Sequence, residues 1–170
     1  DLYEAVWEPR WLRAALELQA AVDDAYFDDE SGAYFLTAHD AERLLMRPMP
    51  REDGAEPAGN SVAALNLLRI AELTGNETYR RRAEYVFRNF AQLMVANPLA
   101  LPKMLCALDF YLDEPLEVVI VSTSGDSDSL AALLARARKT YLPNRMLTVT
   151  GSGGQAGEPD GSRDPFRTVA

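Results

Sequence analysis

The stretch that most constrains this 170-residue sequence is the run from Ser61 to Leu73, which is apolar on nearly every side. A helix of this kind must be covered by several neighbours, because it has no polar face to present to water. Gly75 supplies a left-handed residue that ends the helix. Asn60 or Ser61 can cap its start by accepting a hydrogen bond from a first-turn amide. The sequence therefore predicts a buried central helix.

Amphipathic segments flank this central helix. Apolar residues recur at spacings of three and four from Pro9 to Tyr26 and from Tyr79 to Met94, and Asn97-Pro98 ends the second segment. The turn at Gly75 joins the central helix and the second segment into an αα-hairpin. A third helix runs to about Leu112. Together these segments predict a mainly α fold.

The character of the sequence changes after Pro115. The stretches Leu116–Ser122 and Arg145–Thr150 are rich in β-branched residues, and a helical stripe lies between them. The order β-α-β predicts a parallel pair of strands. The linking loop, residues 122–128, has one glycine and no P-loop lysine. We therefore expect a structural βαβ unit instead of a nucleotide site.

Four conspicuous features favour structural roles. The acidic turn at residues 28–32 lacks the alternating oxygen ligands of a calcium loop, so we expect a β-turn flanked by aromatic packing. His39, the only histidine, lies in a short polar connection and is expected at the surface. Cys106 lies in an apolar run and is expected to be buried. Arg80, Arg81 and Arg82 are expected on a solvated helix face.

Composition excludes several classes of function. A net charge of −9 argues against a nucleic-acid partner, because phosphate binding requires clustered Lys and Arg. No apolar run reaches the roughly 18 to 20 residues needed to cross a bilayer, so no membrane partner is expected. A single cysteine can form no internal disulfide, which favours a reducing, cytoplasmic compartment. The sequence indicates no metal site and no cofactor.

The loop before the central helix, Asp53 to Ser61, holds two carboxylates, a proline, two glycines and an Asn-Ser pair. Asp53 and Glu56 could act as an acid and base pair. They could equally bond backbone amides and Arg47, locking the mouth of the hairpin. Arg47 precedes a proline, so extended backbone would hold it within reach of a carboxylate. The residues leave both roles open, and we favour locking.

A family resemblance rests on this region of the sequence. Arg47-Pro48, the stretch from Asp53 to Arg69 and the turn Leu73-Thr74-Gly75 resemble the C-terminal region of the spermatogenesis-associated, thioredoxin-domain-containing proteins. The resemblance spans most of residues 9–150. Tyr34-Phe35 and Tyr141-Leu142-Pro143-Asn144 agree with it.

The sequence departs from the family pattern at two positions. The family loop usually reads Pro-Ser-Gly-Asn-Ser, so Ala58 removes a hydroxyl, and Met49 stands where lysine is usual. Members of the family carry a thioredoxin-like domain followed by a six-hairpin α/α toroid, similar to N-acylglucosamine 2-epimerases and six-hairpin glycosidases. The resemblance implies that this chain is a fragment: part of the toroid at residues 1–113, a βαβ attachment at 114–150, and a flexible or truncated tail at 151–170.

Two functions of different classes follow from the resemblance. In the first, the toroid is carbohydrate-active, either epimerase-like or glycosidase-like. Asp53 and Glu56 would then be catalytic, and Arg47, Asn60 and Ser61 would bind the carbohydrate. In the second, the chain is a non-catalytic helical scaffold that serves the thioredoxin-like domain of the full-length protein. Whether the protein is an enzyme stays open, and the fragment alone is expected to be inactive.

Overall fold

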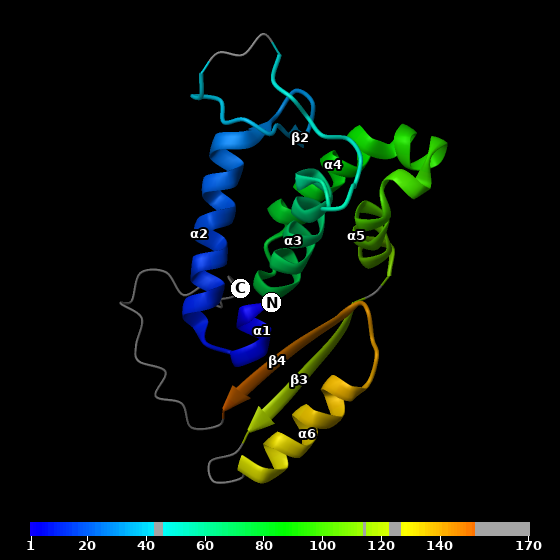
Figure 1. Cartoon of the computed structure of the whole chain (residues 1–170). Helices are drawn as coiled ribbons and strands as arrows, with labels where there is room; N and C mark the ends of the chain where they lie inside the picture. The colour runs from blue at the N-terminus through cyan, green and yellow to red at the C-terminus, as the bar shows by residue number, and fades with distance from the viewer. Residues whose placement is uncertain (43–45, 114, 123–126, 152–170) are drawn as a thin grey trace. The chain divides into compact units, whose positions relative to one another are not determined.

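The computed structural model describes residues 1–42, 46–113, 115–122 and 127–151 (Figure 1). The chain divides into two compact units. One unit lies within residues 8–114, and the other combines residues 1–7 with the described residues from Pro115 onward. Most of the regular structure in both units is helical. The predicted mainly α fold is confirmed.

The unit within residues 8–114 begins with a helix and a β-hairpin. Helix α2, Pro9–Tyr26, starts on the proline whose missing N–H costs nothing in a first turn. Strands β1, Phe27–Asp28, and β2, Ala33–Tyr34, then pair in antiparallel register. The rings of Phe27 and Tyr34 meet edge to face with centroids 5.0 Å apart. The predicted aromatic β-turn is confirmed.

An αα-hairpin follows, as the sequence predicts. Helix α3, Gly59–Thr74, and helix α4, Glu77–Ala96, pack side by side (Figure 1). Gly75 ends α3 in the left-handed region with φ 66°, and the side chain of Asn76 caps α4 by accepting the N–H of Thr78 at 3.0 Å. A short 3₁₀ turn, η1 (Pro98–Ala100), leads to helix α5, Pro102–Leu112, which packs against α3.

The three packed helices share one apolar core, in which α3 is the central element. Eight of its sixteen residues are buried, which fits a helix covered on several sides. The apolar residues of this three-helix core that are completely inaccessible come from all three helices and from the residue before α5: Ala64, Leu67, Leu68, Ala83, Val86, Phe90, Leu101, Met104 and Ala107.

Helix α5 corrects one expectation. Cys106 is exposed, so the prediction of a buried cysteine is wrong. Met104, Ala107 and Phe110 are the buried residues of α5, and their spacing of three sets the inward face of the helix. Cys106 falls outside this face. His39 is exposed, as predicted.

The second unit contains the βαβ element. Strands β3, Leu116–Ser122, and β4, Arg145–Gly151, are parallel, with Leu116 opposite Arg145 and Ser122 opposite Gly151. Helix α6, Ser127–Lys139, connects them and contacts β3. The predicted parallel pairing is confirmed. Most of the linking loop and the tail at 152–170 lie outside the described residues.

Residues 1–7 belong to the unit that holds this sheet. Helix α1, Leu2–Val6, contacts β4, and the Trp7 indole N–H donates to the carbonyl of Leu147 at 3.3 Å. The guanidinium of Arg138 stacks 5.2 Å from the Trp7 ring and donates to the carbonyl of Ala5 at 3.0 Å. These contacts fix the short helix, which by itself is too short to be stable.

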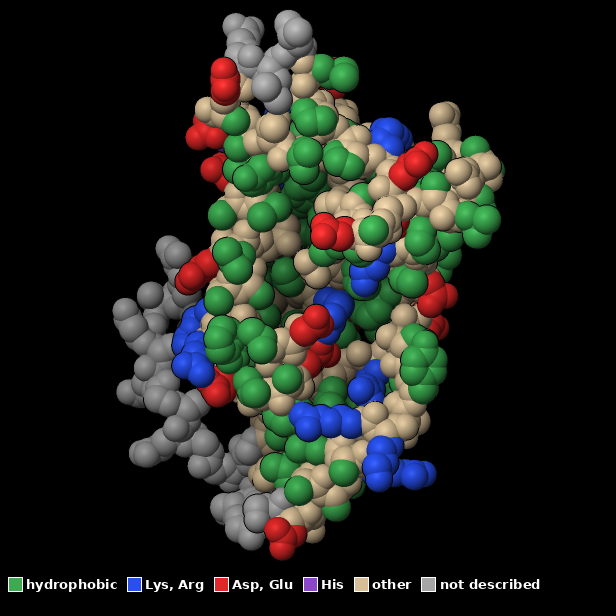
Figure 2. Space-filling model, viewed as in Figure 1, with side chains coloured by type: hydrophobic (Ala, Val, Ile, Leu, Met, Phe, Trp, Pro, Cys, Tyr) green, Lys and Arg blue, Asp and Glu red, His purple; other side chains and the backbone are tan. Residues whose placement is uncertain are grey.

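The surface of the described residues carries large apolar side chains among the charged ones (Figure 2). Those in residues 8–113 with more than half of their surface exposed are Leu18, Leu36, Met46, Val95, Leu99 and Leu112. None of the helices in the described segments is both long enough and apolar enough to cross a membrane.

Gly32, in the turn between β1 and β2, and Gly75, after α3, both have a left-handed backbone. Comparing an alanine substitution at each position measures how closely the β1–β2 turn packs on α4. At Gly32 (φ +69°) a Cβ would lie 3.0 Å from the Cβ of Tyr85, whereas at Gly75 (φ +66°) it would meet nothing within 4 Å. We expect Gly75→Ala to lower the free energy of unfolding by about 1–2 kcal/mol, the cost of the left-handed backbone. Gly32→Ala should cost more, because it adds a steric clash. Urea unfolding measures both, and equal losses would contradict close packing at Gly32.

Candidate functional site

The carboxylate of Asp53 is held entirely by backbone amides. Its Oδ1 accepts the N–H of Ala58 at 2.8 Å, and its Oδ2 accepts those of Lys103 at 2.8 Å and Met104 at 3.4 Å. Ala58 is the residue before α3, while Lys103 and Met104 lie in the first turn of α5. One side chain therefore supplies hydrogen-bond acceptors at the starts of two helices, where backbone N–H groups have no partner within the helix.

The predicted capping of α3 by Asn60 or Ser61 is wrong. No side-chain cap is present at Ala58, the N-cap residue. Asn60 is 1% exposed, and its amide instead pairs with both backbone groups of Tyr34: Oδ1 accepts the N–H, and Nδ2 donates to the carbonyl, each at 2.8 Å. This pairing ties β2 to α3. Ser61 is completely buried, and its hydroxyl has no hydrogen-bond partner in the described structure.

Arg47 also differs from expectation. It forms no ion pair with Asp53 or Glu56 among the described residues. Its Nη2 donates to the carbonyl of Thr37 at 2.7 Å, and its guanidinium stacks 4.2 Å from the ring centre of Phe35. The pairing fails because the Asp53 carboxylate already accepts three backbone amides, and because the segment that follows β2 brings a carbonyl and a ring to Arg47.

Glu56 is the predicted catalytic residue whose carboxylate stays free. The residue is exposed, and its side chain has no hydrogen bond or ion pair with any described residue. Its backbone is fixed, since its carbonyl accepts the N–H of Gly54 at 3.0 Å. The loop thus contains one exposed carboxylate and one whose two oxygens both accept backbone amides. An acid and base pair needs two carboxyl groups that can each exchange a proton with a ligand.

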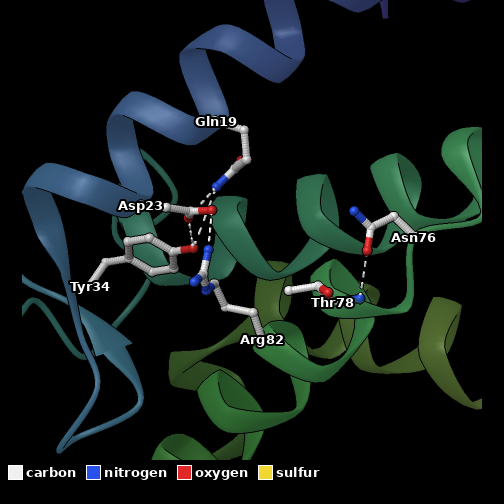
Figure 3. Close-up of polar contacts among 6 residues, drawn as sticks. All are labelled: Gln19, Asp23, Tyr34, Asn76, Thr78 and Arg82. Carbon is white, nitrogen blue, oxygen red and sulfur yellow. Dashed lines mark hydrogen bonds and ion pairs between the residues drawn. The ribbon is translucent and has the colours of Figure 1, made fainter. Parts of the chain in front are cut away.

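A second polar cluster, which the sequence did not single out, centres on Asp23 (Figure 3). The Oδ1 of Asp23 accepts the hydroxyl of Tyr34 at 2.6 Å and the side-chain amide of Gln19 at 2.8 Å. Its Oδ2 pairs with Nη1 of Arg82. These residues come from α2, β2 and α4. The side chain of Asp23 is only 11% exposed, so the cluster is a largely buried brace between three elements.

The chemistry of this brace follows from its electrostatics. Burial raises the pKa of the Tyr34 phenol far above its usual value, and the hydrogen bond to the negative Asp23 raises it further. Tyr34 therefore stays protonated and acts as a hydrogen-bond donor. Both oxygens of Asp23 are engaged, so neither group serves as a free base in this arrangement.

Arg82 and Arg80 correct the prediction of a solvated arginine face. Besides its ion pair, Arg82 stacks 4.7 Å from the ring of Phe27. Arg80 contacts Glu72 at 3.3 Å and lies 5.2 Å from the ring of Tyr111. The sequence held one signal that Arg82 is partly buried. Arg82 lies three residues after Tyr79 and directly before Ala83, at the border of the apolar stripe of α4.

A cleft of about 520 Å³ opens beside the brace. The last turns of α2, strand β1 with its turn, and the start of α4 line it with residues Ala20, Asp23, Asp24, Phe27, Asp29, Asn76, Thr78, Tyr79 and Arg82. Among the residues that the structure describes, no three His, Cys, Asp or Glu side chains are grouped so that they could hold a metal ion.

Comparison with known proteins gives a partial match. The chain is 36% identical over 148 residues to spermatogenesis-associated protein 20 of Rattus norvegicus and 34% identical over 148 residues to the protein of the same name in Homo sapiens. An uncharacterized protein of Caenorhabditis elegans is 33% identical over 146 residues. The matches cover 85–86% of this chain but only 19% of each relative. No family model matches the chain.

The raised pKa of Tyr34 predicts a dependence of stability on alkaline pH. Above about pH 10 the unfolded chain loses the phenol proton while the folded chain keeps it, so the free energy of unfolding falls as pH rises. Below that pH the contribution of Tyr34 is fully present. We expect Tyr34→Phe to flatten this fall, because the titrating group is gone. Urea unfolding at a series of pH values from 8 upward, roughly to 11, measures it.

The matched control for this prediction is Tyr141→Phe, since Tyr141 is 88% exposed. The control should leave the pH dependence close to that of the wild-type chain. If both variants flatten the fall equally, the burial of Tyr34 does not explain it.

Proposed function

We propose that this chain is a helical scaffold, a segment of the α/α toroid of a thioredoxin-domain-containing protein, and that the loop from Asp53 to Ser61 locks its hairpin. Three findings support the proposal: the αα-hairpin of α3 and α4, the packing of α5 on that hairpin, and the similarity to part of spermatogenesis-associated protein 20. The toroid and its thioredoxin-like partner come from the family resemblance. A cytoplasmic location belongs to the same proposal.

The observation that carries the scaffold role is the set of backbone hydrogen bonds that the Asp53 carboxylate accepts. Three backbone amides from two helix starts surround its carboxylate. A carboxylate whose two oxygens both accept backbone N–H bonds acts as a cap for the helix starts, and it has little acceptor capacity left for a ligand. Asn60 is likewise committed to the backbone of Tyr34. The polar groups of the loop therefore serve mainly to join helices.

Stability measurements test the locking role. Asp53→Asn should lower the free energy of unfolding by about 1–3 kcal/mol, because one of its two acceptor oxygens becomes an NH₂ group that cannot accept a backbone amide. Glu56→Gln is the matched control, since its exposed side chain has no described partner, and it should change stability by less than about 0.5 kcal/mol. Urea unfolding of the two variants decides. Losses of similar size would remove the basis for a lock at Asp53.

A second candidate, a carbohydrate-active toroid, is favoured by Glu56 alone. Its carboxylate is exposed and free, on a backbone fixed by the contact of Gly54 with its carbonyl. A carboxylate can accept hydrogen bonds from sugar hydroxyls or exchange a proton with a glycosidic oxygen. Asp53 would then hold the loop in place, and Glu56 would meet the sugar. In this form the chain supplies one of the two carboxyl groups that such chemistry requires.

A binding experiment tests the carbohydrate candidate. Ligand-observed NMR of the chain with a panel of monosaccharides, N-acetylglucosamine among them, should show binding that Glu56→Gln abolishes. Glu52→Gln removes an exposed carboxylate of the same loop region and should leave binding unchanged. If no sugar binds, or if both variants behave alike, Glu56 is not a sugar-binding residue.

A further inference from the structure

We propose that the cleft beside the Asp23 brace binds an organic cation, a guanidinium or primary ammonium group carried on an alkyl chain. This goes beyond the scaffold role and does not depend on it. The proposal starts from the cavity itself, which is about 520 Å³ in volume and lined by three segments, two of which, α2 and α4, are joined by the ion pair of the brace. A space of this size takes a small organic group together with part of its carbon chain.

The charges of the lining select the sign of the ligand. Three carboxylates and one guanidinium line the cleft, which leaves a net charge of −2. Asp23 and Arg82 neutralise each other at the floor. Asp24 and Asp29 are exposed, and neither has a hydrogen bond or ion pair with any described residue. An anion would be repelled, whereas a cation would gain two opposite charges.

The aromatic residues indicate the kind of cation. The ring of Phe27 is already covered by Arg82 at 4.7 Å. Tyr79 is half-buried, and its ring contacts no other ring and no cation within the described segments. An aromatic ring that lines a cleft next to carboxylates can attract guanidinium and ammonium groups through its quadrupole. A bare metal ion needs several oxygen ligands converging on one point, and the described residues offer no such group.

The floor of the cleft and the start of α4 are fixed before any ligand arrives. Asp23 is held by Tyr34, Gln19 and Arg82, and Asn76 caps α4 through the N–H of Thr78 at 3.0 Å (Figure 3). A preorganised site spends little free energy on ordering its own side chains when a ligand binds. The brace thus acquires a second role, which is to position the cleft.

Isothermal titration of the whole chain tests the proposal with a probe that has a charged side chain and an isostere whose side chain is uncharged. L-arginine amide should bind. L-citrulline amide has the same α-amine, but a urea group replaces its guanidinium, so its dissociation constant should be at least about tenfold higher, a difference of 1.4 kcal/mol. Equal binding of the two probes would overturn the guanidinium site, and so would the absence of any binding. L-lysine amide tests the ammonium form, which should also exceed the citrulline probe.

Substitutions of residues that line the cleft test whether arginine amide binds there. Asp24→Asn and Asp29→Asn should each weaken arginine amide by about threefold to tenfold, because an opposite charge near the surface is worth on the order of 1 kcal/mol. Glu52→Gln removes the same charge from an exposed position outside the cleft and should change binding by less than twofold. Tyr79→Phe should keep the affinity, and Tyr79→Leu should lose it. Equal effects of Glu52→Gln and the Asp variants would overturn the site.

Two probes distinguish the source of the cation. A blocked pentapeptide with arginine between glycines should bind at least tenfold more tightly than arginine amide if the cation belongs to a polypeptide. Affinities within tenfold assign the cleft to a free small molecule. Circular dichroism of each variant confirms that the chain stays folded, so a loss of binding reports on the cleft and not on unfolding.

Discussion

The carboxylate of Asp53 is the contact on which the packing of α3 and α5 depends. Helix α5 starts at Pro102, which has no N–H, and the next two amides in its first turn both reach Asp53. The same carboxylate holds Ala58 directly before α3. These groups lie next to the fully buried Leu101 and Met104. Without Asp53, amides at the edge of the core would lack acceptors, and such groups are costly to leave unpaired.

Two further polar contacts fasten the β-hairpin to the helices. Asn60 pairs with both backbone groups of Tyr34, so a side chain in α3 substitutes for a neighbouring strand. The hydroxyl of Tyr34 reaches Asp23 of α2, which also binds Arg82 of α4. Tyr34 therefore contacts α3 and α2 directly and is linked to α4 through Asp23. Most of the polar groups that the sequence offered for chemistry take part in this joining, whereas the exposed carboxylates of Glu56, Asp24 and Asp29 have no partner among the described residues.

The similarity to spermatogenesis-associated protein 20 gives this arrangement a wider setting. It covers 86% of the chain and therefore extends across residues of both units, although it spans only 19% of the relatives. A scaffold role agrees with a segment whose polar motif joins helix starts. The two ligand sites that we propose lie in separate places: Glu56 is in the loop before α3, and Asp24 and Asp29 are at the cleft between α2 and α4.

The sequence by itself determined the extent of α2, the C-terminal ends of α3 and α4, and the parallel strand pair. Pro9, Gly75 and Asn97-Pro98 act locally, through a missing N–H, a left-handed residue and a chain that cannot continue as a helix. Periodicity and β-branched runs are equally local signals. The αα-hairpin and the buried character of α3 followed from them directly.

Only the tertiary structure decided which polar groups meet. Asp53 and Lys103 are 50 residues apart, and Asp23 and Arg82 are 59 apart, so no spacing rule relates them. For the same reason the sequence assigned the cap of α3 to Asn60 or Ser61, paired Arg47 with a carboxylate, and left Arg82 in solvent. Local sequence fixes backbone dihedrals within a few residues. The partner of a buried charge or amide is set by which elements pack together, and that is a property of the whole fold.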